Sequence, residues 1–189
     1  MPKDASETRA RIVAAASRLF YGQGLGVSVD DVAAEAGVTK RTLYYHFRSK
    51  DDLIAVYLAV RDEPTVGIVM GWMDAVDGPL AAKLETVFAQ LARLARLPNW
   101  RGCGFLRTAA ELAAMPGHPA IKVGAKHKTA VEAWLASVIA ADGRKKAAEL
   151  ARQIVILMDG AFSTMLIHRD PLYIEAAGRA AAALVGARK

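Results

Sequence analysis

Residues 28–50 read SVDDVAAEAGVTKRTLYYHFRSK, and this stretch determines the fold that the sequence predicts. Ser28 is followed three residues later by Asp31, a capping-box pattern that marks the start of a helix. Gly37 can adopt the left-handed conformation that ends such a helix. Because a second helical segment follows directly, the stretch predicts two short helices around a tight turn.

The second helix of this pair combines an apolar face with a basic, aromatic face. Leu43 and Phe47 are spaced i, i+4 and are expected to be buried together. Between residues 39 and 50 the chain has four basic and no acidic side chains, whereas acidic residues occur on the preceding helix. Charge segregated in this way is typical of a surface that binds a polyanion. The adjacent Tyr44 and Tyr45 cannot both enter a core already filled by Leu43 and Phe47.

These features together predict a helix-turn-helix whose second helix reads DNA. Cations would contact phosphates, and aromatic rings would contact sugars and thymine methyl groups. Lys40 or Arg41 is expected to contact guanine or phosphate, and Ser28 to donate to a phosphate. The residues predicted to line the DNA are Ser28, Thr39, Lys40, Arg41, Thr42, Tyr44, Tyr45, His46 and Lys50.

The segment TKRTLYYHFRSKDDL resembles the recognition helix and following helix start of the TetR family of bacterial transcriptional regulators. The upstream segment TRARIVAAASRLFYGQGLGVSVDDVAAEAGV resembles the first two helices of the same family. The resemblance covers about the first third of the chain. It implies an all-α homodimer that binds double-stranded operator DNA, usually as a repressor, and that releases it when a small ligand enters the C-terminal domain.

Length and composition fit this architecture. The 189 residues suit an N-terminal module of 1–50 and a larger helical domain of 51–189 for ligand binding and dimerisation. The formal net charge of +6 is compatible with polyanion binding. No signal peptide opens the chain and no uncharged apolar run reaches membrane-spanning length, so we expect a cytoplasmic protein without a membrane partner. The fold class expected is all-α, an N-terminal three-helix bundle plus a C-terminal helical domain.

The helix that follows Ser49 is expected to link the two domains. Pro64 and Gly67 interrupt its pattern, and either a hinge within the helix or an irregular loop would explain them. Further helices are predicted over 79–97, from 102, and over 119–141, 144–168 and 171–187.

The last two helices differ from the others because they are apolar or small on nearly every face. Such helices must be covered on more than one side, which predicts an oligomer interface. The family resemblance implies the same surface, a four-helix bundle between subunits. The residues expected in this interface or its immediate support are Ile154, Leu157, Met158, Phe162, Met165 and Leu184.

Large apolar groups spread over several helices predict a site for a small hydrophobic or aromatic effector, with a few polar groups to orient it. The residues expected to line it are Trp72, Phe88, Trp100, Phe105, Arg107, Glu111, His127, Trp134, Met158 and Phe162. The segment GCGFLRTAAEL at 102–112 resembles a GC-x-x-x-Asn-Ala-Ala-x-Glu segment of many TetR regulators, with Arg107 where Asn is usual.

Other chemistry receives little support from the sequence. Cys103 is the one cysteine, so intrachain disulfides and multi-cysteine metal motifs are excluded, and the scattered histidines suggest no metal site. Cys103 could be a reactive sensor thiol near a helix start or a small buried side chain. No hydrolase or phosphate-loop motif is present, and no cofactor or enzymatic activity is expected. The alternative to a DNA-binding regulator is a helical ligand-binding or enzymatic domain with an incidental basic helix.

Overall fold

The computed structural model describes the backbone of residues 3–186 and the side chains of residues 5–61 and 66–186. The described residues form α-helices without any strand, as the sequence predicted. In chain order these are α1 (Lys3–Gln23), α2 (Val29–Glu35), α3 (Lys40–His46), α4 (Lys50–Asp74), α5 (Leu80–Ala95), α6 (Gly104–Glu111), α7 (Pro119–Ala141), α8 (Ala147–His168) and α9 (Leu172–Gly186).

The helices belong to two compact units, and the division is not the one at residue 50 that the sequence suggested. The first unit contains residues 1–62 and 104–125, and the second contains residues 63–103 and 126–189. Helix α6 and the start of α7 therefore group with the N-terminal helices, although they follow α5 in the chain. Both α4 and α7 are shared between the units.

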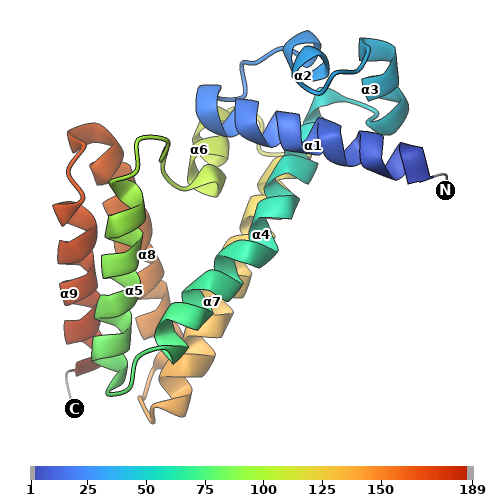
Figure 1. Ribbon diagram of the computed structural model, residues 1–189. Coiled ribbons are helices and arrows are strands. Elements are labelled where there is room, and N and C mark those ends of the chain that lie inside the picture. The colour runs from blue at the N-terminus through green and yellow to red at the C-terminus, as the bar shows by residue number, and fades with distance from the viewer. Residues whose placement is uncertain (1–2, 187–189) are drawn as a thin grey trace. The chain divides into compact units, whose positions relative to one another are not determined.

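In the first unit, α1, α2 and α3 pack against one another around an apolar core (Figure 1). Ile12 of α1, Val32 of α2 and Leu43 of α3 are each fully buried. Full burial of one such side chain contributes about 1.5–3 kcal/mol to folding. The rings of Phe20 and Tyr57 meet edge to face, with 5.7 Å between their centroids, and thereby connect α1 to α4. Phe47, at the end of α3, is buried as predicted.

In the second unit, α9 lies alongside both α5 and α8 (Figure 1). Helices α5 and α9 approach each other closely at Gly178, which faces Phe88. A Cβ atom added to Gly178 would lie 2.5 Å from the Cβ of Phe88, so only glycine fits this position without movement of a helix. The core of this unit also contains Leu84, Ile139 and Ile154, all almost fully buried.

Helix α4 continues through Pro64, which answers the question that the sequence left open. One α-helix spans Lys50–Asp74, so the irregular loop expected as one alternative is wrong. Proline has no amide hydrogen and cannot donate to the carbonyl four residues before it, so the helical ladder lacks one bond there. Pro64 also lies next to the division between the two compact units.

Several helix ends differ slightly from their predicted positions. Helix α8 begins at Ala147 and not at Arg144. Residue 187, where α9 was expected to end, lies outside the described residues. Helix α8 is long and apolar enough, by length and composition alone, to cross a membrane, and helices in protein cores pass the same test.

Candidate nucleic-acid interface

The turn between α2 and α3 has the geometry that the sequence predicted. Gly37 has φ +63°, and its amide donates to the carbonyl of Ala34 while the amide of Val38 donates to that of Ala33. This pair of bonds is the Schellman arrangement that terminates a helix and satisfies its last carbonyls. It directs the chain into α3 within three residues.

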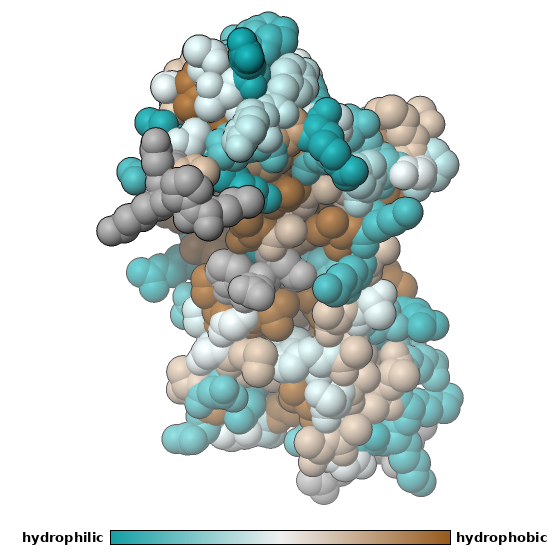
Figure 2. All heavy atoms as spheres, turned by 90° about the vertical axis from the view of Figure 1, so that its right-hand side faces the viewer, coloured by the Kyte–Doolittle hydropathy of each residue, from teal (hydrophilic) through white to brown (hydrophobic). Residues whose placement is uncertain are grey.

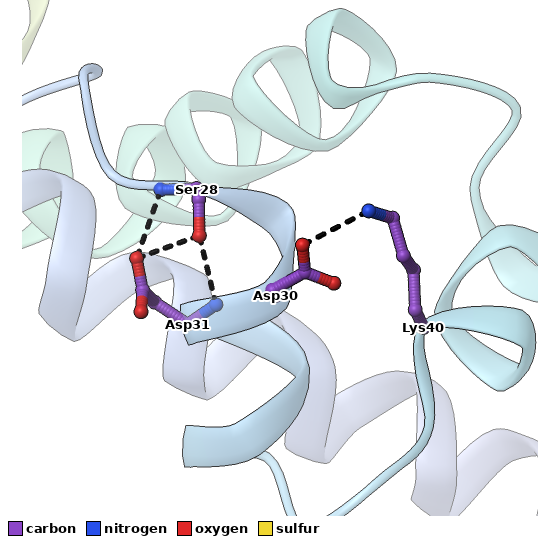
Figure 3. A network of polar contacts seen from close by, with 4 residues as sticks. All are labelled: Ser28, Asp30, Asp31 and Lys40. Carbon is purple, nitrogen blue, oxygen red and sulfur yellow. Dashed lines mark hydrogen bonds and ion pairs between the residues drawn. The ribbon is translucent and has the colours of Figure 1, made fainter.

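Ser28 and Asp31 form the predicted capping box at the start of α2 (Figure 3). The Ser28 hydroxyl accepts from the Asp31 amide at 3.1 Å and donates to Asp31 Oδ2 at 2.6 Å. The hydrogen bond from this hydroxyl, together with one from the Ser28 amide, lowers the pKa of Asp31 below its ordinary value. The hydroxyl hydrogen of Ser28 is thus directed at Asp31, whereas the sequence suggested that it would be donated to phosphate.

Helix α3 presents a polar and aromatic surface to solvent. Its N-cap is Thr39, whose side chain accepts from the amide of Thr42 at 3.1 Å. Arg41 and Tyr44 are exposed, and Tyr45 has 82% of its surface accessible. An aromatic side chain so exposed is compatible with a surface that a partner covers. Figure 2 shows that hydrophilic and near-neutral side chains gather over the part of the molecule formed by the N-terminal helices.

Two cations of this surface are held by carboxylates in the free protein. The ammonium of Lys40 lies 2.9 Å from Asp30 Oδ2, and Arg48 Nε lies 2.9 Å from Asp52 Oδ2. The hydrogen bond that Lys40 donates to Asp30 raises the pKa of Lys40, and the charge of Asp30 adds to this effect. Nothing in the sequence indicated the Lys40–Asp30 pair, because its partners are ten residues apart on different helices.

Lys50, also predicted to contact DNA, is partly buried at the start of α4. Its ammonium donates to the carbonyl of Leu25, in the segment that joins α1 to α2. The amide of the same Leu25 donates to Glu111 Oε2 of α6 at 2.7 Å. Leu25 is therefore bonded through its amide to α6 and through its carbonyl to α4. We refer to Leu25, Lys50 and Glu111 as the Leu25 clamp.

Arg107 lies beside this clamp and bonds to the end of α1. Its Nη1 donates to the carbonyl of Tyr21 at 2.7 Å. Two guanidinium groups lie over the Tyr21 ring. That of Arg61 is 4.3 Å from the ring centroid, and that of Arg107 is 5.7 Å from it. Arg107 and Glu111 were expected to orient an effector. In the structure both lie on α6, where Arg107 bonds to the last turn of α1 and Glu111 to the segment that follows α1.

His118 adds a contact that the sequence did not indicate. It is buried before α7, and its Nδ1 accepts from the amide of Ala120 at 3.1 Å. Its Nε2 lies 3.2 Å from Asp51 Oδ1 in the first turn of α4. Both ends of the 104–125 segment thus contact the N-terminal helices.

The other residues expected around an effector lie mostly in the second unit. Phe88, His127 and Phe162 are buried there, and Trp72, Trp100, Trp134 and Met158 are half-buried. The rings of Trp100 and Phe162 lie near each other, with 6.1 Å between their centroids. Phe105 is buried in α6 of the first unit. Cys103 is half-buried.

The residues expected at a dimer interface divide into two groups. Ile154, Phe162 and Met165 are buried within their own subunit, and Leu157, Met158 and Leu184 are half-buried. The apolar side chains that α8 and α9 expose are others, namely Ile156, Ile167, Leu172 and Tyr173. Because α8 is apolar or small on nearly every face, its sequence alone did not reveal which face is inward.

Comparison with known proteins agrees with this geometry. Residues 12–57, which include the whole helix-turn-helix, match the family model described as bacterial regulatory proteins, tetR family. The chain is 32% identical over 99 residues to the HTH-type transcriptional regulator SrpR of Pseudomonas putida. This alignment covers 44% of this chain and 46% of SrpR. It is also 32% identical over 99 residues to the uncharacterized HTH-type transcriptional regulator TtgW, likewise of Pseudomonas putida, covering 44% of this chain and 74% of TtgW.

A solved structure extends the similarity over nearly the whole chain. SCO4454, a TetR-family transcriptional regulator from Streptomyces coelicolor, superposes with a TM-score of 0.82 at 31% sequence identity, covering 95% of this chain and 94% of that one. The helix-turn-helix geometry and these similarities lead to one conclusion: the chain belongs to the TetR family of DNA-binding bacterial transcriptional regulators.

Proposed function

We propose that this regulator is a repressor that binds a palindromic operator as a homodimer and releases it when a small hydrophobic effector binds. The observation that carries the proposal is the surface of α3, where Thr39, Arg41, Tyr44 and Tyr45 are exposed on a helix without acidic residues. In a helix-turn-helix, the second helix enters the major groove and its first residues contact base edges. The N-terminal module of residues 1–50 would supply these contacts, with Tyr44 positioning the helix on the backbone.

A homodimer is proposed because one short helix-turn-helix reads only half a site. The exposed residues of α8 support this, since Ile156, Gly160, Ser163 and Ile167 follow one another at the spacing of a single helix face. Ile156 and Ile167 have 63% and 76% of their surfaces accessible. Packing of this face against a second subunit would remove its apolar side chains from water. The buried residues of α8 would hold the helix in place behind this face.

The effector site is proposed in the second unit, all of which lies within the larger domain of 51–189 expected from the sequence. Half-buried Trp72, Trp100 and Trp134, together with Phe162, provide the apolar surface typical of a small-molecule site. Lys128 and Asp159 form an ion pair between α7 and α8 of this unit that is about three-quarters buried. Such a pair could orient a polar group on an otherwise aromatic effector.

The Leu25 clamp suggests how the signal would reach the DNA. Arg107 bonds α6 to the last turn of α1 and Glu111 bonds it to the segment before α2, so displacement of α6 would act directly on the elements that lead into the helix-turn-helix. Effector binding can shift the equilibrium only by its difference in affinity for the DNA-bound and released conformations. Replacement of Glu111 by Gln should weaken the clamp and reduce the effector response while operator binding remains, as measured by effector titration of a preformed DNA complex.

DNA binding itself is tested by selection from a random duplex library, followed by affinity measurements from 50 to 200 mM salt. A dimer that neutralises 6–10 phosphates should lose roughly 10³–10⁵ in affinity over this range and should select a symmetric sequence. The alternative, a helical ligand-binding or enzymatic domain with an incidental basic helix, predicts no selected sequence and weak binding. Absence of enrichment would contradict the proposed function.

A further inference from the structure

The Lys40–Asp30 ion pair joins the two helices of the helix-turn-helix on their solvent side (Figure 3). Asp30 is in the first turn of α2 and Lys40 is the first residue of α3. Their charged atoms lie 2.9 Å apart, and both side chains are more than half exposed. The pair therefore lies on the surface of the module, beside the end of the helix that would enter the groove.

Asp30 has no part in the capping of α2. The capping box uses its neighbour Asp31, which bonds to both the amide and the hydroxyl of Ser28. Among the residues that the structure describes, Lys40 is the side chain that Asp30 bonds. In the first turn of α2 its negative charge interacts favourably with the helix dipole, but on a polyanion-binding surface the same charge also repels the partner.

The pair changes what Lys40 can bind. An ammonium has three hydrogen-bond donors, and Asp30 uses one of them, so two remain for a further acceptor. A phosphate placed on Lys40 would bring a second anion close to the Asp30 carboxylate. The O6 and N7 atoms of guanine are uncharged acceptors, so a base edge does not incur this repulsion. The pair therefore disfavours phosphate relative to guanine at this position.

We propose that Asp30 is a specificity-determining residue, which holds Lys40 so that it reads a base edge in the major groove and does not act as a phosphate contact. The proposal rests on the proposed binding of DNA through α3. Asp30 would lower the affinity for non-specific DNA, because one cation of each subunit is withheld from the phosphates. It would also fix the position of a lysine side chain that otherwise has many rotamers.

The test replaces Asp30 by Asn, which keeps the shape of the side chain and removes its charge. Affinities are measured by fluorescence anisotropy for two duplexes of equal length, one selected by the protein and one scrambled. For the scrambled duplex, D30N should bind more tightly, and the dependence of log affinity on log salt should steepen by about 0.9 per subunit. The ratio of specific to non-specific affinity should fall about fivefold or more, the lower end of what one base contact contributes.

Asp52→Asn provides the matched control, because it releases Arg48 from a 2.9 Å ion pair in the same compact unit. This variant should raise the affinities for both duplexes by similar factors and leave their ratio unchanged. In a Lys40→Gln background, D30N should have little effect on the ratio, since the side chain that Asp30 positions is absent. Circular dichroism establishes that each variant is folded.

An unchanged ratio in D30N, or a change equal to that in D52N, would overturn the proposal, because Asp30 would then act only through total charge. A full effect of D30N in the Lys40→Gln background would overturn it as well. These outcomes differ from failure of the proposed function, in which the wild-type protein itself selects no duplex.

Discussion

Replacement of Gly178 by Ala should destabilise the second unit, even though alanine is the better helix former. Gly178 lies within α9, where alanine is favoured over glycine by about 1 kcal/mol. Against this gain, the new Cβ would lie 2.5 Å from the Cβ of Phe88, whereas ordinary contact begins at 3.4 Å. The two helices would have to separate by the difference, about 0.9 Å.

The size of the effect follows from these opposing contributions. A rotamer change cannot relieve the contact, because the atom on Phe88 is its Cβ, which is fixed by the backbone of α5. Overpacking of this kind typically costs 1–3 kcal/mol, so subtracting the helix gain of about 1 kcal/mol leaves an expected net loss of up to about 2 kcal/mol in the free energy of unfolding. For a chain of this length that corresponds to a decrease of up to about 8 °C in melting temperature.

Gly71→Ala is the matched control, because Gly71 lies in α4 with nothing within 4 Å of an added Cβ. The same chemical change should there stabilise the protein by about 0.5–1 kcal/mol. Both variants are compared with wild type by urea unfolding at one protein concentration, since stability depends on concentration in a dimer. Equal stabilisation by both substitutions would refute the close packing of α5 and α9.

Three further predictions concern the DNA surface, the dimer and the capping box. Replacement of both Tyr44 and Tyr45 by Ala should abolish binding of the selected duplex without change in helical content or sedimentation, and wild-type affinity in this variant would exclude α3 as the reading helix. Replacement of Ile156 or Ile167 by Glu would place an unpaired charge in the proposed dimer interface and weaken dimerisation by several kcal/mol. Sedimentation should then show monomers where the wild type is dimeric, and dimers of unchanged stability would argue against this face. Because the pKa of Asp31 is lowered in the folded state, its contribution to stability is present above pH 3.8 and is lost as the pH falls through the folded-state value. The difference in unfolding free energy between wild type and Asp31→Asn should therefore shrink between pH 6 and pH 3. A difference that stays constant over this range would contradict the prediction.

The helix-turn-helix could be predicted from the sequence because its determinants are local. The capping box of Ser28 and Asp31, the left-handed Gly37 and the buried pair Leu43 and Phe47 each depend on residues within four positions of one another. Spacing and residue type are sufficient at that range.

Contacts between distant segments could not be predicted in this way. Glu111 and Leu25 are 86 residues apart, and periodicity contains no information about such a partner. Arg107 and Glu111 were expected from the sequence to orient an effector, and nothing in the sequence indicated that Arg107 bonds to Tyr21 or Glu111 to Leu25. Similarly, the apolar composition of α8 indicated an interface but did not distinguish buried Ile154 from exposed Ile156.

The composition of the first compact unit has a consequence for how the protein folds during its synthesis. The unit is discontinuous in the chain, because residues 63–103 are made between its two parts. At about 5–20 residues per second, a ribosome needs roughly 2–8 s for this interval. Until α6 has been made, the Leu25 amide and the Tyr21 carbonyl lack the partners that this helix supplies. Completion of the first compact unit on the nascent chain therefore awaits synthesis of α6.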